Sequence, residues 1–236
     1  MNAPRSPRPE SLAAALGLAR GALSEAAGRS RPRLELRGPL AFTLGRVHEL
    51  CGPARRTLAA IVAGALEGPV LWMRPARERD RLNPEGLAPL AGPERFIFAD
   101  ILRAEDALWC LEETLRSGLV PLVVAELPAP PGLTPVRRLQ LAAEAGAAEE
   151  GGVPPLGLLL TPGDGGAPGV ESRWWMAPCH RPGRDLWRLE LRRARGGAPP
   201  TVLALERHRR RLTLRPWIEA DGHAATERLP RRSGTA

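Results

Sequence analysis

The stretch "VHELCGPARRTLAA", from Val47 to Ala60, has the layout of a strand that turns through a loop into a helix. Its apolar, strand-like part ends at Cys51-Gly52-Pro53, and a helical pattern begins near Arg55. A strand, a glycine turn and a helix in immediate succession are typical of α/β proteins, and of the loops that bind nucleotide phosphates. The stretch therefore predicts an α/β fold and raises the question of nucleotide binding.

The loop lacks two groups that hold a phosphate. In loops of the pattern GxxxxGK[ST], glycines let backbone N–H groups turn onto the phosphates, and a lysine reaches the β- and γ-phosphate oxygens. This loop keeps Gly52 and Thr57, but it is shorter, and Arg55 and Arg56 occupy the places of the second glycine and the lysine. The planar fork of arginine does not replace a lysine inside a tight nest. We therefore expect a vestigial site with no bound nucleotide or other cofactor.

Composition bounds the class of protein. The chain has 236 residues, of which 43% are hydrophobic, enough for one large domain or a domain with a smaller appendage. We find no run of about 18 uncharged apolar residues and no apolar leader behind "MNAPRSPRPE", so we expect a cytoplasmic protein without membrane contact. Three scattered cysteines and four histidines without ligand-like spacing argue against a disulfide framework or a metal site.

The positive charge is concentrated in the last third of the chain. The net charge is +8, and every basic side chain is arginine. Residues 1–150 carry 19 arginines and 18 acidic residues, whereas residues 151–236 carry 15 arginines and 8 acidic residues. The excess predicts an anionic partner there, nucleic acid or an acidic protein surface, with a merely solvated basic face as the alternative.

Strand-like and helix-like patterns alternate through the middle of the chain, which predicts a mostly parallel sheet flanked by helices. Gly118 should cap the clearest helix, and Thr134 should be the N-cap residue of the next. Strands are expected at "RVHELCG", "PVLWMRP", "RFIFAD", "LVPLVVAEL" and "LGLLLT", and helices at "RRTLAAIVAGALEG", at 104–117 and from 134 to 146.

Four regions are expected along the chain. Residues 1–43 should form a helix over 9–28 and a linker with a short strand, and residues 44–162 the α/β core. Residues 163–219 should add antiparallel basic strands to the same sheet, and residues 220–236 a disordered tail.

The C-terminal strands supply the candidate contacts for DNA or a protein partner. Period-2 alternation in "LWRLELR" places Trp187 with the core leucines and the intervening arginines on the other face. One of the consecutive residues Trp174 and Trp175 must face outward, and an exposed Trp is an anchor candidate. The candidate contacts are Trp174, Arg188, Arg192, Arg193, and the basic hairpin residues Arg207, Arg209, Arg210 and Arg211.

Several segments together resemble the ImuA family. These are "GRVHELCGPARRTLAA", "RAEDALWCLEETLRSG" followed by "LVPLVVAEL", "RRLQLAAEAG" and "WRLELRRARGG", in order between Gly45 and Gly197. ImuA proteins are RecA-like accessory proteins of damage-inducible (SOS) mutagenesis. The resemblance implies a RecA-like core and a non-catalytic adaptor in translesion DNA synthesis. Its implied partners are ImuB, which is an inactive Y-family polymerase relative, an error-prone C-family DNA polymerase, and RecA.

The resemblance also extends the comparison of the nucleotide site. Arg74 stands where the RecA pattern implies a catalytic glutamate, and Ala125 where it implies the aspartate that assists magnesium. Glu126 lies one step further along its strand, and a slip of one position would restore it as a poor substitute. Metal support, charge stabilisation and water activation are each compromised, so we expect no enzyme activity.

Three alternative functions stay open at this point. The chain could be a direct DNA-binding module acting through its basic last third, and its binding would then fall steeply with salt. It could be a degenerate ATPase with arginine in place of lysine, or an SOS cell-division inhibitor, which shares the RecA-like core. Catalysis by the adjacent Cys179 and His180 lacks an orienting third group.

Overall fold

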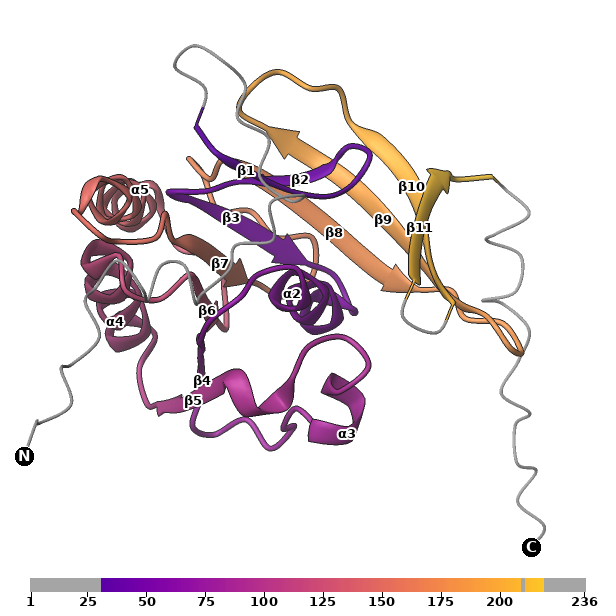
Figure 1. Ribbon diagram of the computed structural model, residues 1–236, viewed down its shortest axis with the longest axis horizontal. Helices are drawn as coiled ribbons and strands as arrows, with labels where there is room; N and C mark the ends of the chain where they lie inside the picture. The colour runs from indigo at the N-terminus through magenta and orange to yellow at the C-terminus, as the bar shows by residue number, and fades with distance from the viewer. Residues whose placement is uncertain (1–30, 209–210, 219–236) are drawn as a thin grey trace, which may run out of the picture.

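A nine-stranded sheet organises the protein in a computed structural model that describes residues 31–208 and 211–218 (Figure 1). The strands lie in the order β11-β10-β9-β8-β3-β7-β6-β4-β5. Their bounds are β3 Arg46–Cys51, β4 Val70–Pro75, β5 Phe96–Ile101, β6 Leu122–Glu126, β7 Leu156–Leu160, β8 Ser172–Pro178, β9 Asp185–Ala194, β10 Thr201–His208 and β11 Arg211–Pro216.

The sheet is parallel from β5 to β8 and antiparallel beyond it. Strand β3 pairs in parallel with β7 on one side and with β8 on the other, whereas β9, β10 and β11 follow as antiparallel strands. The predicted mostly parallel α/β sheet with antiparallel C-terminal strands is thus confirmed. The direction of β8 differs from the prediction, because the chain after β7 returns to β3, where the N–H of Glu171 bonds the carbonyl of Val47. Alternating burial is the same in both strand directions, so the sequence pattern could not distinguish them.

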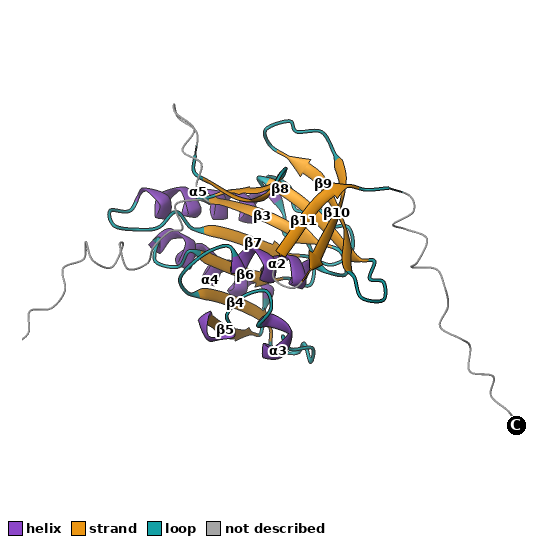
Figure 2. Ribbon diagram, turned by 45° about the vertical axis from the view of Figure 1, so that its right-hand side comes forward, coloured by secondary structure: helices purple, strands orange, loops and turns teal. Residues whose placement is uncertain are grey.

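Two layers cover the two faces of the sheet (Figures 1 and 2). Helices α4 (Ala104–Ser117) and α5 (Leu133–Ala148) bury one face, where their apolar residues form a cluster with β3, β6 and β7. Helix α2 (Arg55–Gly64) and a hairpin of β1 (Arg33–Arg37) and β2 (Leu40–Thr43) cover the other. The short α3 (Pro84–Leu87) and the 3-10 turn Pro93–Arg95 connect β4 to β5.

The predicted helix ends are correct at one helix and shifted at another. Helix α4 has the predicted bounds, and Gly118 caps it in the left-handed conformation with φ of 63°. Helix α5 begins at Leu133 with Gly132 as its N-cap residue, so Thr134 is inside the first turn.

The β1–β2 hairpin extends the core ahead of the boundary expected at residue 44. Leu34, Leu40 and Phe42 are fully buried and belong to the cluster beneath α2. Glycine and proline at 38–39 interrupt the apolar pattern, which is why this segment has the sequence of a linker. The helix expected over 9–28 and the tail expected over 220–236 lie outside the described residues. Within the described ranges, no helix has the length and apolar character needed to span a membrane.

Candidate functional site

The loop between β3 and α2 uses its own backbone N–H groups in internal hydrogen bonds. The N–H of Gly52 donates to the carbonyl of Gly163 at 2.9 Å, and the N–H of Ala54 to that of Met176 at 2.9 Å. The N–H of Arg55 donates to the carbonyl of Gly52 at 3.3 Å, and proline 53 has no N–H. A phosphate nest needs such donors to converge on the ligand, and here they are directed at protein carbonyls.

Gly52 is required by packing at this loop. Its φ is +86°, and a Cβ added to it would lie 2.5 Å from the carbonyl oxygen of Met176 on β8. A side chain would therefore face both a steric clash and an unfavourable backbone conformation. The glycine that resembles the start of a phosphate loop serves here to let the loop lie against β8.

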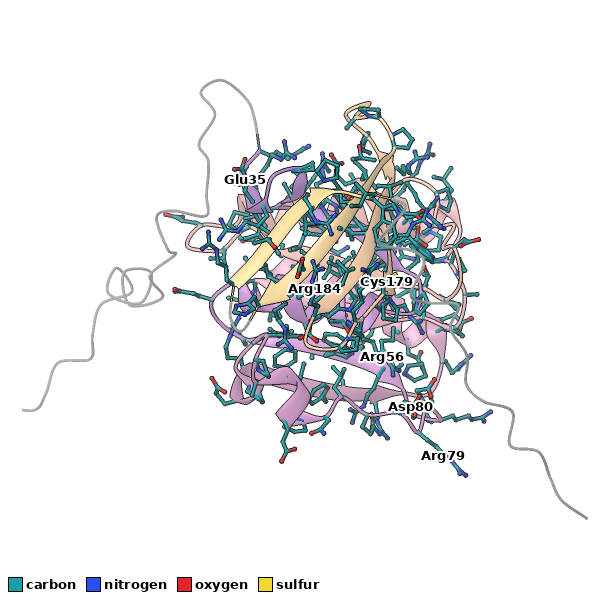
Figure 3. The ribbon with its side chains drawn as sticks, turned by 90° about the vertical axis from the view of Figure 1, so that its right-hand side faces the viewer. Glu35, Arg56, Arg79, Asp80, Cys179 and Arg184 are labelled. Carbon is teal, nitrogen blue, oxygen red and sulfur yellow. The ribbon has the colours of Figure 1, made fainter. Side chains whose placement is uncertain are left out.

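Arg56, which stands in the place of the lysine, forms an ion pair with Glu126. Its Nε donates to Glu126 Oε2 at 2.8 Å, and its Nη2 lies 2.7 Å from the same oxygen. The other carboxylate oxygen, Oε1, accepts a hydrogen bond from Trp72 Nε1 at 2.7 Å. The first turn of α2, the end of β6 and the middle of β4 thus meet at one buried carboxylate. Arg56 is labelled in Figure 3.

The ion pair neutralises the positive charge of Arg56, which a bound phosphate would need. Glu126 is 6% exposed, so its carboxylate depends on Arg56 and Trp72 in place of water. An anion that recruited Arg56 would leave Glu126 as an unpaired buried charge. Such a separation is costly, since removing one partner of a buried pair typically destabilises a protein by about 3–5 kcal/mol.

The structure corrects the expected positions on β6. Ala125 packs into the cluster beneath α4 and α5, whereas Glu126 points to the α2 face, where the loop lies. The strand-end carboxylate that faces the loop is therefore Glu126, as a slip of one position would place it. It is engaged with Arg56 in the described structure.

Arg74 lies at the end of β4 and pairs with a carboxylate that the sequence did not single out. Its Nε donates to Asp100 Oδ1 at 2.6 Å, and Arg81 Nη1 donates to the same oxygen at 2.6 Å. The guanidinium carbon of Arg74 lies 4.8 Å from the ring centroid of Phe98. Hydrogen bonds from the two arginines lower the pKa of Asp100, so it remains ionised and engaged.

A second buried carboxylate, Glu49 on β3, holds the glycine-rich loop after β7. It is 0% exposed and accepts hydrogen bonds from Thr161 Oγ1 at 2.7 Å and from the N–H groups of Gly166 and Ala167 at 2.9 and 3.1 Å. Arg173 forms its ion pair. The only available signal in the sequence was a lone acidic residue in an apolar strand.

The cysteine and histidine candidates have structural surroundings. Burial, with a contribution from the Glu49 carboxylate, raises the pKa of Cys51 to about 12, so its thiol stays protonated. His180 Nδ1 accepts a hydrogen bond from the N–H of Leu186 at 3.1 Å, and its ring packs edge-on against Trp187. Among residues 31–208 and 211–218, no group of His, Cys, Asp or Glu side chains could hold a metal ion.

The structure corrects the choice between the two consecutive tryptophans. Trp174 is 1% exposed and belongs to the core cluster beneath α2, so it is not an exposed contact. Trp175 is the partly exposed residue of the two. The two faces of a strand alternate, but the sequence did not show which of the two faces was covered.

The candidate arginines on the C-terminal strands are distributed over separate surroundings. Arg188 and Arg192 both pair with Glu190 on the half-exposed side of β9, and Arg193 is exposed. Arg207 belongs to β10 and pairs with Asp185, with Nη2 and Oδ2 2.6 Å apart. Arg211 begins β11 and is exposed, whereas Arg209 and Arg210 lie outside the described residues.

Comparison with known proteins found relatives by sequence and a solved structure with a similar fold. No protein-family model matches the chain. Over 152 residues the chain is 37% identical to "Protein ImuA" of Caulobacter vibrioides, in strain NA1000 / CB15N and in strain ATCC 19089 / CIP 103742 / CB 15. The match spans 56% of this chain and 58% of each ImuA protein. The chain is thus a homologue of ImuA over that region.

A solved structure with a similar fold is that of the RadB recombinase. The superposition has a TM-score of 0.51, covers 72% of this chain and 91% of RadB, and pairs residues that are 15% identical. At that identity the likeness concerns the fold alone. It confirms the expected RecA-like α/β fold, with its mostly parallel sheet and C-terminal antiparallel strands.

Proposed function

We propose that the chain is a non-catalytic RecA-like adaptor in SOS-induced translesion DNA synthesis. It would bridge ImuB, an error-prone C-family DNA polymerase, and RecA. The observation that carries the proposal is the ion pair of Arg56 with Glu126, which joins the lysine's place in the loop to the neighbouring strand-end carboxylate. A RecA-like core whose loop is committed to internal bonds keeps the fold without the nucleotide chemistry.

The homology to ImuA supports the setting of this function. The homologous region includes over half of this chain. It covers 58% of the matched ImuA protein, so the rest of that protein is not matched. The damage response and the polymerase partners therefore come from the family likeness, and the residues of the loop support the absence of catalysis.

Exposed apolar residues on separate elements support an adaptor that contacts more than one protein. Trp109 on α4 is 60% exposed and lies beside a cavity of about 200 Å³ between α4 and α5. At the edge of the sheet, Ile97 on β5 is 55% exposed, and the outer edge of β5 has no neighbouring strand among the described residues. Aromatic anchors and open strand edges are two common means of binding protein partners.

The experiment is recovery of the tagged chain from DNA-damaged cells of the source organism, with nuclease added and the bound proteins read by mass spectrometry. Nuclease-resistant recovery of the polymerase-like partners or RecA is the expected result. Trp109→Ala and Ile97→Asp should each reduce recovery of a partner, while the exposed Glu78→Gln serves as a control. Recovery of none of these partners, or of nuclease-sensitive ones only, would contradict the adaptor function.

A further inference from the structure

The outer face of the C-terminal strands carries a row of four side chains, on β8, β9, β10 and the residue that follows β11. Trp175 pairs with Glu190, and Glu190 pairs with Val202. The N–H of Trp217 then bonds the carbonyl of Val202 at 3.2 Å. With strands about 4.8 Å apart, the two tryptophans are separated by roughly 14 Å along this row. In the described part of the chain, the helices on this side, α4 and α5, pack over β3, β6 and β7 (Figure 1).

An arginine lies over each of the two tryptophans. The guanidinium carbon of Arg192 is 4.7 Å from the centroid of the Trp175 ring, and that of Arg188 is 5.5 Å from the Trp217 ring. Such pairs hold the flat guanidinium groups close to aromatic rings. Aromatic rings and guanidinium planes are the two surfaces on which proteins stack unpaired bases.

Basic side chains continue this face toward α5. Arg193 and Arg195 on the strand β9 side, together with Arg137 of α5, line a cavity of about 450 Å³ and are all exposed. Glu190 and Asp164 are the acidic residues that pair with Arg188 and Arg192. Glu144 also lines this cavity, where it pairs with Arg46. The other five arginines exceed the two carboxylates Glu190 and Asp164, so the face has the charge complementary to a phosphate backbone.

Arg192 has two acidic partners, and a phosphate could replace one of them, Asp164; the other, Glu190, has a side chain that is 15% exposed. Asp164 has a side chain 85% exposed, and its ion pair with Arg192 lies at the surface. Exposed ion pairs contribute little to stability, so exchange of this carboxylate for a phosphate oxygen has a small cost. Arg192 thus has one exposed partner, whereas the partner of Arg56, Glu126, is buried.

We propose that this face binds single-stranded nucleic acid, with phosphates held by Arg192, Arg193 and Arg137 and unpaired bases stacked at Trp175–Arg192 and Trp217–Arg188. The proposal goes beyond the adaptor function and does not depend on it, since protein bridging needs no nucleic acid. Stacking requires unpaired bases, so the face prefers single strands to duplexes. Each phosphate neutralised adds about 0.7 to the slope of log affinity against log salt.

The test is fluorescence anisotropy of the full chain with a labelled oligothymidylate longer than the roughly 4–16 nucleotides that one OB-fold domain covers. Trp217→Ala should weaken binding about tenfold, the order expected for one stacked base. Arg193→Glu should weaken binding and lower the salt slope. Trp175→Ala should act like Trp217→Ala, with circular dichroism checking that it is folded.

Two matched controls lie elsewhere on the molecule. Trp109→Ala removes an exposed tryptophan from α4, and Arg79→Glu reverses an exposed charge in the loop after β4, away from the C-terminal strands (Figure 3). Neither should change the affinity by more than about twofold. The proposal is overturned if Trp217→Ala and Arg193→Glu behave like these controls, or if duplex binds as tightly as the single strand. It is also overturned if these variants lose a protein partner while the wild-type chain binds no oligonucleotide, because the face is then a protein interface.

Discussion

Replacing Glu126 by glutamine tests how strongly the internal pair holds the loop. The substitution keeps the shape of the side chain and an oxygen that can accept from Trp72, but it removes the charge that faces Arg56. Loss of one partner of a buried pair costs about 3–5 kcal/mol. The Arg56 side chain is 23% exposed, so water can partly compensate, and we take the lower end, about 3 kcal/mol. For a chain of this size that corresponds to a fall in Tm of about 9 °C.

Thermal melting followed by circular dichroism measures this effect. Glu113→Gln is the matched control, because Glu113 pairs with Arg116 at the surface, where such a pair contributes at most about 1 kcal/mol. The double variant Arg56→Met, Glu126→Gln should recover most of the lost stability, since it leaves no unpaired charge. A Glu126→Gln variant that melts with the wild type, or with Glu113→Gln, would refute the reasoning.

Three further predictions concern the core and the loop. Burial lowers the pKa of His48 from 6.5 to about 4, so the unfolded chain takes up this proton first as the pH falls. Stability present above pH 6.5 should therefore decline by about 3 kcal/mol toward pH 4, and urea titrations of His48→Gln should lack that part of the decline. Gly52→Ala should lower the free energy of unfolding by about 1–3 kcal/mol through its positive φ, with more from the clash at Met176. Gly196→Ala, where no atom lies within 4 Å of the added Cβ, should have little effect in the same denaturation assay. Trp174→Ala should cost about 3–5 kcal/mol as a large core truncation, and Trp175→Ala clearly less; equal losses in Tm would contradict the assigned faces.

Local patterns predicted the parts of the fold that depend on neighbouring residues. The helix Ala104–Ser117 has acidic residues in its first turn, an arginine in its last turn and a glycine cap, and these signals agree. The buried strands β6 and β7 have continuous apolar runs, as expected in a parallel sheet. The hairpin ahead of β3 and the parallel direction of β8 depend on contacts with distant segments, and no local pattern carries that information.

The candidate site was predictable in its residues but not in its bonds. Gly52, Arg56 and the end of β6 could be found from the loop pattern and the family resemblance. That Glu126, one residue beyond Ala125, reaches Arg56 follows from which face of β6 the helix α2 covers. Glu49 and Asp100 were missed because the groups that donate to their carboxylates lie on segments remote in sequence.

The most informative measurement is a melting curve of the wild-type chain with and without millimolar Mg-ATP or Mg-ADP. A nucleotide at about 100 times its Kd would stabilise the folded chain by about 2.7 kcal/mol, which is a clear upward shift in Tm. With the amides of the loop directed at protein carbonyls and Arg56 paired with Glu126, we predict no shift with either nucleotide. A saturable upward shift that Glu126→Gln or Arg56→Met changes would show that the loop binds nucleotide, and would contradict a function that depends on the fold alone.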